Sequence, residues 1–346
     1  MDSIKKKRKP LTSNLITLAI VCVLFAVVFI LVETGNATRH MRSMLVPICI
    51  NIILAVSLNL TVGFLGELTL GHAGFMSVGA YAGCLFSIAM EEILPMALRF
   101  PLAMLVGGLV AACFGVLIGI PVLRLHGDYL AIVTLAFGEI IRSVIINLEF
   151  TGGAAGLKGT PQDSTFVIAF VVVLITLVVI MNLVNSRHGR AITAIRDNRI
   201  AAEACGINVT YFRMLAFVIA AFFAGVAGVL YGHNLSILSA STFDYNKSIE
   251  LLVIVVLGGM GSITGSVLGT VLLCALPELL RAVGDWRLVM YGLAVIVIMI
   301  VRPKGLMGGK ELPVGRICRA VGRIFTKKKK DLPPPDGGSV GEEASV

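Results

Sequence analysis

Long apolar segments separated by short polar ones follow one another along most of the chain. A helix needs roughly 20 apolar residues to cross the hydrocarbon core of a bilayer. The segments do not alternate with a period of two, and backbone in lipid must satisfy its own hydrogen bonds, so the pattern predicts helices and not a closed β-barrel. The predicted segments are 11–33, 43–63, 70–90, 99–123, 128–148, 164–184, 211–232, 249–258, 262–281 and 285–302.

Segment 249–258 is too short to cross a bilayer alone, so we interpret it as a half helix whose partner begins at Ser262. The pattern then gives ten crossings, or eight if 249–281 and 128–148 are re-entrant. The predicted fold class is an all-α polytopic membrane protein of about ten transmembrane or half-membrane helices with an internal repeat.

Two glycine-rich breaks interrupt these segments, "GFLGELTLG" (63–71) and "GGMGSITG" (258–265). Paired breaks in two halves of a chain are typical of a transport path built on an internal repeat. Close helix packing is the alternative, and for the stripe of small residues over 220–232 packing alone is favoured. The residues predicted to line the path are Gly66, Glu67, Thr69, Gly71, His72, Gly258, Gly259, Gly261, Ser262 and Thr264.

Lysine and arginine predict the orientation, because they are enriched in cytoplasmic flanks. They cluster in the N-terminal tail (1–10), the loop 185–213 and the C-terminal tail (303–346), whereas loops 149–163 and 233–248 carry one lysine each. Both termini are therefore predicted to be cytoplasmic, on either side of a permease domain spanning 11–302. The last residues, "DLPPPDGGSVGEEASV", are predicted to be a disordered tail.

Composition supports a membrane protein: hydrophobic residues make up 57% and charged residues 14% of the chain, against about 25% charged in soluble domains. The net charge of +9 could indicate nucleic-acid binding. The basic residues lie instead at predicted membrane flanks, so no nucleic-acid partner is expected. The N-terminus resembles a signal peptide, but its apolar part is long, so a retained first span is predicted.

Signs of catalysis are weak. "GGAAGLKGT" (152–160) lacks the spacing of a phosphate loop. Glu67 and His72 would lie about 140° apart around a helix, which does not suit metal ligands. Glu139 and Arg142 are three residues apart and are predicted to pair, with a substrate role as the alternative. We expect no catalytic residue, metal or cofactor in this chain.

The loop 185–210 predicts a short amphipathic helix over Arg190–Cys205, ended by Gly206. It would place Ile192, Ile195 and Ala202 on one face. A solvated loop and a docking helix for a cytoplasmic partner are both compatible with this pattern.

"AIRDNRIAAEACGI" resembles the coupling loop of ABC importer permeases, in which Glu-Ala-Ala is followed after three residues by Gly. Counting back from Gly206, Ile200 stands where the family has that Glu. "GELTLGHAGFMSVGAYAG", "RLHGDYLAIVTLAFGEIIR", "VVLGGMGSITGSVLG" and "RPKGLMGG" also resemble the branched-chain amino acid branch of these permeases, specifically its M-type subunit. The resemblance covers residues 44–309, and Glu67 stands where the family tends to carry Gln.

The resemblance implies a permease subunit in a bacterial inner membrane, paired with an H-type permease. Two cytoplasmic ABC ATPases would bind ATP and Mg²⁺, and an extracytoplasmic binding protein would deliver leucine, isoleucine, valine or a related amino acid. Another cargo (urea, a short amide or an aromatic acid), a carrier or channel without ATPases, and a membrane-embedded enzyme are the alternatives. The residues expected to couple to the ATPases are Arg196, Asp197, Ala201, Ala202, Glu203 and Gly206.

Overall fold

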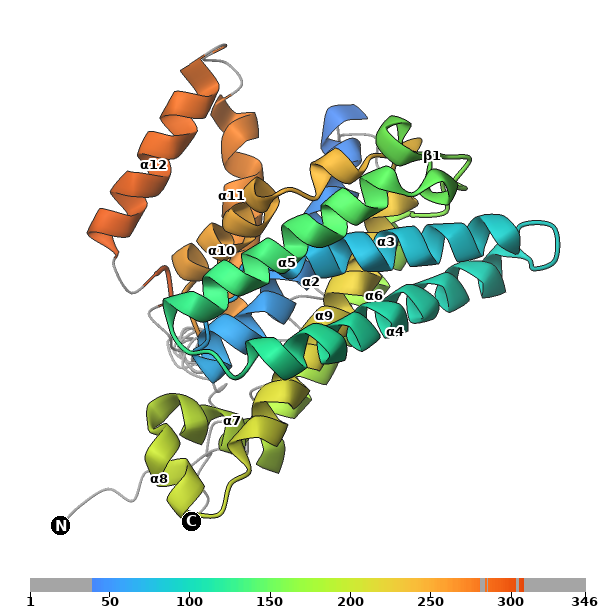
Figure 1. Ribbon diagram of the computed structural model, residues 1–346. Coiled ribbons are helices and arrows are strands. Elements are labelled where there is room, and N and C mark those ends of the chain that lie inside the picture. The colour runs from blue at the N-terminus through green and yellow to red at the C-terminus, as the bar shows by residue number, and fades with distance from the viewer. Residues whose placement is uncertain (1–38, 281–283, 285, 303–304, 308–346) are drawn as a thin grey trace, which may run out of the picture. The chain divides into compact units, whose positions relative to one another are not determined.

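A computed structural model describes residues 39–280, 284, 286–302 and 305–307. Most of this part is helical (Figure 1). The helices are α2 (Arg39–Asn59) with its π-helical continuation η1 (Leu60–Leu65), α3 (His72–Ala89), α4 (Met96–Val122), α5 (Asp128–Asn147), α6 (Phe166–Asn185), α7 (Arg187–Asp197), α8 (Arg199–Ala204), α9 (Val209–Gly232), α10 (Tyr245–Gly258), α11 (Ile263–Leu279) and α12 (Arg287–Val301). Short 3₁₀ turns are η2 (Glu149–Thr151), η3 (Gly153–Ala155) and η4 (Ala240–Thr242).

The predicted apolar segments are confirmed as helices wherever the structure describes them. Within the described residues, six helices are long and apolar enough to span a membrane, or seven if α10 and α11 count as one span bent by 120°. The predicted total of about ten is therefore only loosely matched by this part of the chain. Segment 11–33 and the two tails, 1–10 and 308–346, lie outside it.

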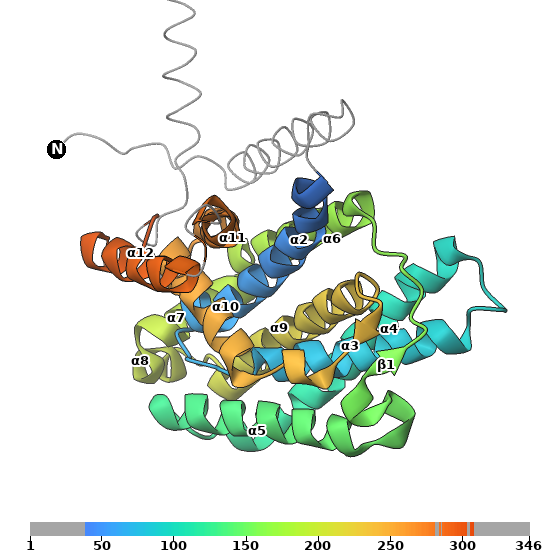
Figure 2. The same cartoon turned by 90° about the horizontal axis from the view of Figure 1, so that it is seen from above.

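The helices differ in how deeply they lie within the bundle. In the span Ser43–Leu65, which joins α2 to η1, 83% of the most apolar stretch is buried inside the chain, against 28% in α5. Figure 2 shows α5 and α6 on opposite sides of α9. Large apolar side chains on α4, α5 and α12 are exposed, among them Leu117, Ile132 and Leu293, as expected for helices that face lipid or another membrane chain.

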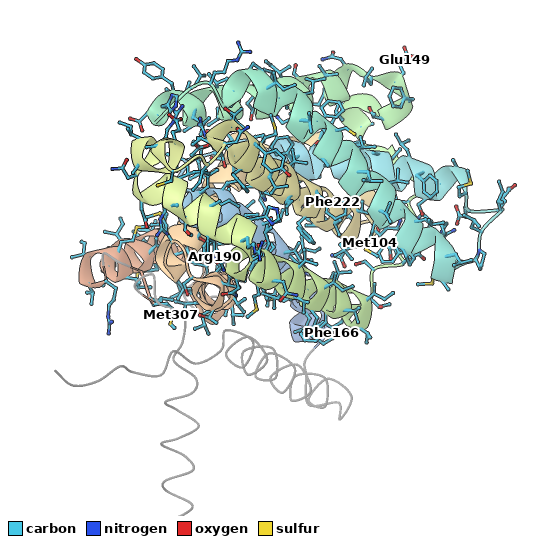
Figure 3. The ribbon with its side chains drawn as sticks, turned by 90° about the horizontal axis from the view of Figure 1, so that it is seen from below. Met104, Glu149, Phe166, Arg190, Phe222 and Met307 are labelled. Carbon is cyan, nitrogen blue, oxygen red and sulfur yellow. The ribbon has the colours of Figure 1, made fainter. Side chains whose placement is uncertain are left out.

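Small residues bring α3, α4 and α9 into close contact. A Cβ atom at Gly79 of α3 would overlap the backbone of Gly225 of α9, and one at Gly228 would overlap the carbonyl of Met76. Phe222 of α9 and Met104 of α4 lie along the α4–α9 contact (Figure 3). The prediction that the 220–232 stripe serves packing is thus confirmed.

The helices α7 and α8 lie at the end of α9 where that helix begins, and two loops pair at the end where it stops. There, β1 (Leu157–Lys158) and β2 (Ile237–Leu238) form a two-stranded antiparallel ladder. In the loop that follows β1, Asp163 Oδ2 lies 2.7 Å from Arg99 Nη2 of α4 in a buried ion pair. Since α9 has 24 residues, about 36 Å separates the two ends.

Candidate functional site

The two glycine-rich breaks lie against each other, joined by Asn59. Its Nδ2 donates to the carbonyl of Ser262 and to the hydroxyl of Ser266, both at 2.9 Å. Its Oδ1 accepts the Gly261 N–H, also at 2.9 Å. Asn59 is fully buried and is the last residue of α2 before η1. One amide side chain therefore links two breaks about 200 residues apart in sequence.

Glycine is required at these breaks by backbone conformation and by close approach. Gly66 and Gly261 have φ values of 80° and 76°, a region that side chains other than glycine rarely adopt. A Cβ at Gly66 would also lie 2.6 Å from Cγ of Arg196. At Gly63 it would overlap the backbone nitrogen of Gly261. The breaks are shaped to pack against each other and against α7.

The helix α7 rests directly on the first break. Arg196 Nη1 donates to the carbonyl of Gly63 at 3.1 Å, while its Nη2 lies 3.0 Å from Asp197 Oδ1. Ile192 and Ile195 of α7 are buried, as their predicted common face requires. A residue expected to couple to a partner thus touches the backbone of a predicted path element.

The single helix predicted over Arg190–Cys205 is wrong in one respect: the chain forms two helices, broken at Asn198. Asn198 adopts an extended backbone, and its side chain accepts the Ala201 N–H, so a new helix begins there. Ala202 is buried as predicted, while Ile200 is 80% exposed. Gly206, with φ of 80°, ends α8 through the Ile207 N–H bond to the Ala202 carbonyl.

Glu67, just after η1, forms an ion pair with Arg213 of α9. Arg213 Nη2 also donates to the carbonyl of Leu125, at 3.2 Å, in the turn between α4 and α5. In the same turn, His126 contacts Arg199 of α8. Burial raises the pKa of Glu67 above its ordinary value, and the charge of Arg213 opposes that shift. Glu67 is therefore a paired group in a network between helices and not an isolated pore charge.

Comparison of the sequence with known proteins identifies the family to which the chain belongs. The family described as "Branched-chain amino acid transport system / permease component" matches residues 40–301. The chain belongs to this family. The permease is 36% identical over 297 residues to the high-affinity branched-chain amino acid transport system permease protein LivM of Salmonella typhimurium, which covers 75% of this chain and 68% of the relative. LivM of Escherichia coli matches to the same extent.

More distant relatives include both permease types. The probable LivM of Methanocaldococcus jannaschii is 25% identical over 61% of the permease and 69% of its own length. LivH of Escherichia coli is 32% identical over 37% of the permease and 42% of its own length. No solved structure matches the permease.

Other predicted path residues of the permease make internal contacts. His72 Nε2 lies 2.8 Å from Ser57 Oγ, and the Thr69 and Thr61 hydroxyls are 3.3 Å apart. A Cβ at Gly71 would lie 2.7 Å from the carbonyl of Thr134. These contacts hold the segment between η1 and α3 in place, and the predicted role in the path stays a prediction.

The second break is closed in a similar way. The Ser262 and Thr264 hydroxyls lie 3.2 Å apart, and a Cβ at Gly258 would overlap the carbonyl of Gly265. Gly259, with φ of 112°, packs against Gly305, where a Cβ would lie 2.6 Å from the Gly259 Cα. The segment just after α12 therefore forms part of this region of the permease.

The Glu139–Arg142 pair is confirmed, with Arg142 Nε 2.9 Å from Glu139 Oε2. Sequence reasoning missed Asn59 and the partner of Glu67. It also assigned Lys247 to a loop, although α10 begins at Tyr245. A local signal for that start exists, since Asp244 accepts the Lys247 N–H as an N-cap. No local signal joins Glu67 to Arg213.

Proposed function

We propose that this permease is the M-type subunit of an ATP-driven importer of branched-chain aliphatic amino acids in a bacterial inner membrane. It would form half of the translocation path beside an H-type permease. Two cytoplasmic ATPases would supply the energy, and an extracytoplasmic binding protein would deliver the cargo. The names of the LivM and LivH relatives support the cargo and the pairing.

The observation that carries the coupling proposal is the Arg196 hydrogen bond to the carbonyl of Gly63. Closure of the ATPases on ATP would push on the exposed side of α8, which carries Ile200 and Glu203. Since α7 is held to η1 by Arg196, and η1 is held to the α10–α11 break through Asn59, the push would reach both breaks. Movement there would change which side the path faces.

The proposed orientation in the membrane follows from the end of the bundle that carries α7 and α8. The basic helices α7 and α8 would face the cytoplasm. The Leu306 N–H donates to the Leu257 carbonyl at 2.8 Å, so the chain after α12 begins at the end that carries α7. This supports a cytoplasmic C-terminus.

The test uses proteoliposomes that hold the permease with its partner permease and ATPases, supplied with binding protein and leucine. Arg196→Gln is expected to retain basal ATP hydrolysis and lose leucine-stimulated hydrolysis and uptake together, because α7 loses its bond to η1. Glu203→Arg is expected to lose both activities through weaker ATPase docking. The matched control is Arg190→Gln, because Arg190 is an exposed arginine of α7, the helix that also carries Arg196.

Unchanged stimulation in Arg196→Gln and Glu203→Arg would refute the coupling role. Leucine uptake by this permease in vesicles without ATPases would show a secondary carrier instead. Uptake of urea or an aromatic acid, with leucine inert, would overturn the cargo assignment.

A further inference from the structure

Two oppositely charged side chains, Lys247 and Glu250, lie in the first turns of α10, on the part of that helix away from the break at its end. Lys247 Nζ is 3.1 Å from Glu250 Oε2 and 3.2 Å from Asn51 Oδ1 of α2. The Lys247 side chain is 20% exposed and that of Glu250 is 45% exposed. Charged groups within a membrane bundle are costly, so such a pair calls for a functional explanation.

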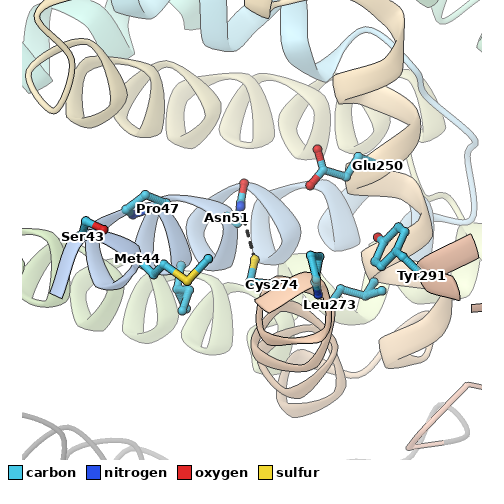
Figure 4. Close-up of a pocket in the computed structure, with 10 residues that line it drawn as sticks. Ser43, Met44, Pro47, Asn51, Glu250, Leu273, Cys274 and Tyr291 are labelled. Atoms are coloured by element: carbon cyan, nitrogen blue, oxygen red, sulfur yellow. Dashed lines mark hydrogen bonds between the residues drawn. The ribbon is translucent and has the colours of Figure 1, made fainter. Parts of the chain in front are cut away.

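Glu250 lines a cavity, and Lys247 lies just behind its wall, bonded to two of the wall residues, Glu250 and Asn51. Asn51 and Glu250 lie on the wall of a space of about 370 Å³ between α2, α10, α11 and α12 (Figure 4). Small-molecule sites commonly have a volume of about 300–1,000 Å³, with mostly apolar walls and a few placed polar groups. The remaining wall residues are Ser43, Met44, Pro47, Ile48, Leu273, Cys274, Pro277 and Tyr291.

The wall also offers backbone polarity. Pro277 lies inside α11 and has no N–H to donate to the carbonyl of Leu273, four residues earlier. The Asn51 amide, in turn, donates to Cys274 Sγ at 3.4 Å. The cavity thus combines a carboxylate, a nearby ammonium, an amide and a carbonyl without its helical donor with an apolar wall.

We propose that this cavity binds a zwitterionic aliphatic amino acid on its way through the permease, which rests on the proposed function. The ammonium of the amino acid would bind Glu250, and its carboxylate would bind Lys247. Its side chain would lie against Met44, Ile48 and Leu273. Each charge of the zwitterion takes the place of one partner in the Lys247–Glu250 ion pair. Neither Lys247 nor Glu250 is therefore left as a buried, unpaired charge.

The chemistry selects against ligands that lack one charge. An amide without a carboxylate leaves Lys247 without a new partner, and an acid without an ammonium does the same to Glu250.

The cavity is linked to the breaks through α2. Asn51 and Asn59 lie eight residues apart on this helix, about 12 Å along the axis. Movement of α2 by α7 would therefore reach the cavity directly.

The first measurement is the initial rate of leucine uptake in cells whose own copy of the permease is deleted and replaced. We expect Lys247→Gln and Glu250→Gln each to lower the rate by about tenfold or more, as loss of a charged hydrogen bond implies. Lys158→Gln and Glu149→Gln, exposed residues of the loop between α5 and α6, are the matched controls. Each rate is divided by the amount of permease in the membrane.

The second measurement distinguishes binding from support of the fold. The purified complete transporter, without binding protein, is treated with a thiol reagent, and modification of Cys274 is followed by mass spectrometry. Leucine is expected to slow this modification more than leucinamide or 4-methylpentanoate. Lys247→Gln should remove the difference between leucine and leucinamide, and Glu250→Gln the difference between leucine and 4-methylpentanoate.

Uptake by Lys247→Gln and Glu250→Gln at the level of the controls would overturn the site while leaving the importer function intact. Equal protection of Cys274 by all three compounds in the unmodified transporter would overturn it as well. Absence of leucine uptake by the unmodified transporter would instead overturn the proposed function, and the site with it.

Discussion

Replacing Asn59 by leucine tests whether the two breaks are held together by a single side chain. The substitution keeps a similar shape but removes three hydrogen bonds, to Ser262, Ser266 and Gly261, each 2.9 Å long. A buried hydrogen bond contributes about 1 kcal/mol to stability, so the free energy of unfolding is expected to fall by about 3 kcal/mol. The Gly261 N–H, left without its acceptor, adds to this loss.

The assay is thermal unfolding of the detergent-purified transporter, followed together with leucine uptake. A loss of about 3 kcal/mol is expected to lower the melting temperature by about 5 °C or more. Asn147→Leu is the control, because Asn147 Nδ2 donates to the Ser143 carbonyl at an exposed position. Melting of Asn59→Leu together with that control would refute the reasoning, since it would mean that the breaks are held by packing alone.

Two further predictions concern paired charges with little exposure. Arg99→Met removes the partner of buried Asp163 and is expected to lower the free energy of unfolding by about 3–5 kcal/mol. The double variant Arg99→Met/Asp163→Leu is expected to regain most of this loss, because it leaves no buried charge unpaired. Thermal unfolding of both variants checks this, and equal melting temperatures for the single and double variants would contradict it. Burial raises the pKa of Glu67 above its reference value of 4.5 despite its pairing with Arg213, so the folded permease binds a proton at Glu67 more readily than the unfolded chain does. Its contribution to stability is therefore full below pH 4.5 and lost as pH rises through the raised pKa. As the pH is raised from 4.5 through the raised pKa of Glu67, the melting temperature should fall less steeply in Glu67→Gln than in the unmodified permease. Parallel curves of melting temperature against pH would argue against a raised pKa.

The sequence predicted the helices well because the signal is local. A run of apolar residues such as 164–184 must form a helix in lipid, whatever packs beside it. The boundary at Lys247 was misplaced for the same reason, since a charged residue near a helix end weakens the apolar signal. The break at Asn198 was missed because Asn198 follows several good helix formers, and only its capping bond to Ala201 shows that a second helix starts.

The candidate site was predictable only in part. The glycines at 66 and 261 marked the breaks, but the contact of Gly63 with Gly261 depends on tertiary packing. Glu67 was conspicuous, whereas its partner Arg213 lies in a helix far along the chain. Pairs so distant in sequence leave no periodic pattern, so their roles follow only from coordinates.

The way α10 ends has a consequence for biosynthesis. Its terminal carbonyls, at Leu257 and Gly258, accept hydrogen bonds from the N–H groups of Leu306 and Met307. The last carbonyls of a helix otherwise lack partners in the helix itself. Because translation proceeds from the N-terminus, those donors are made only after α11 and α12. This break therefore reaches its final hydrogen bonding after α12 has entered the membrane, whereas the segments around α3 and α4 can pack earlier.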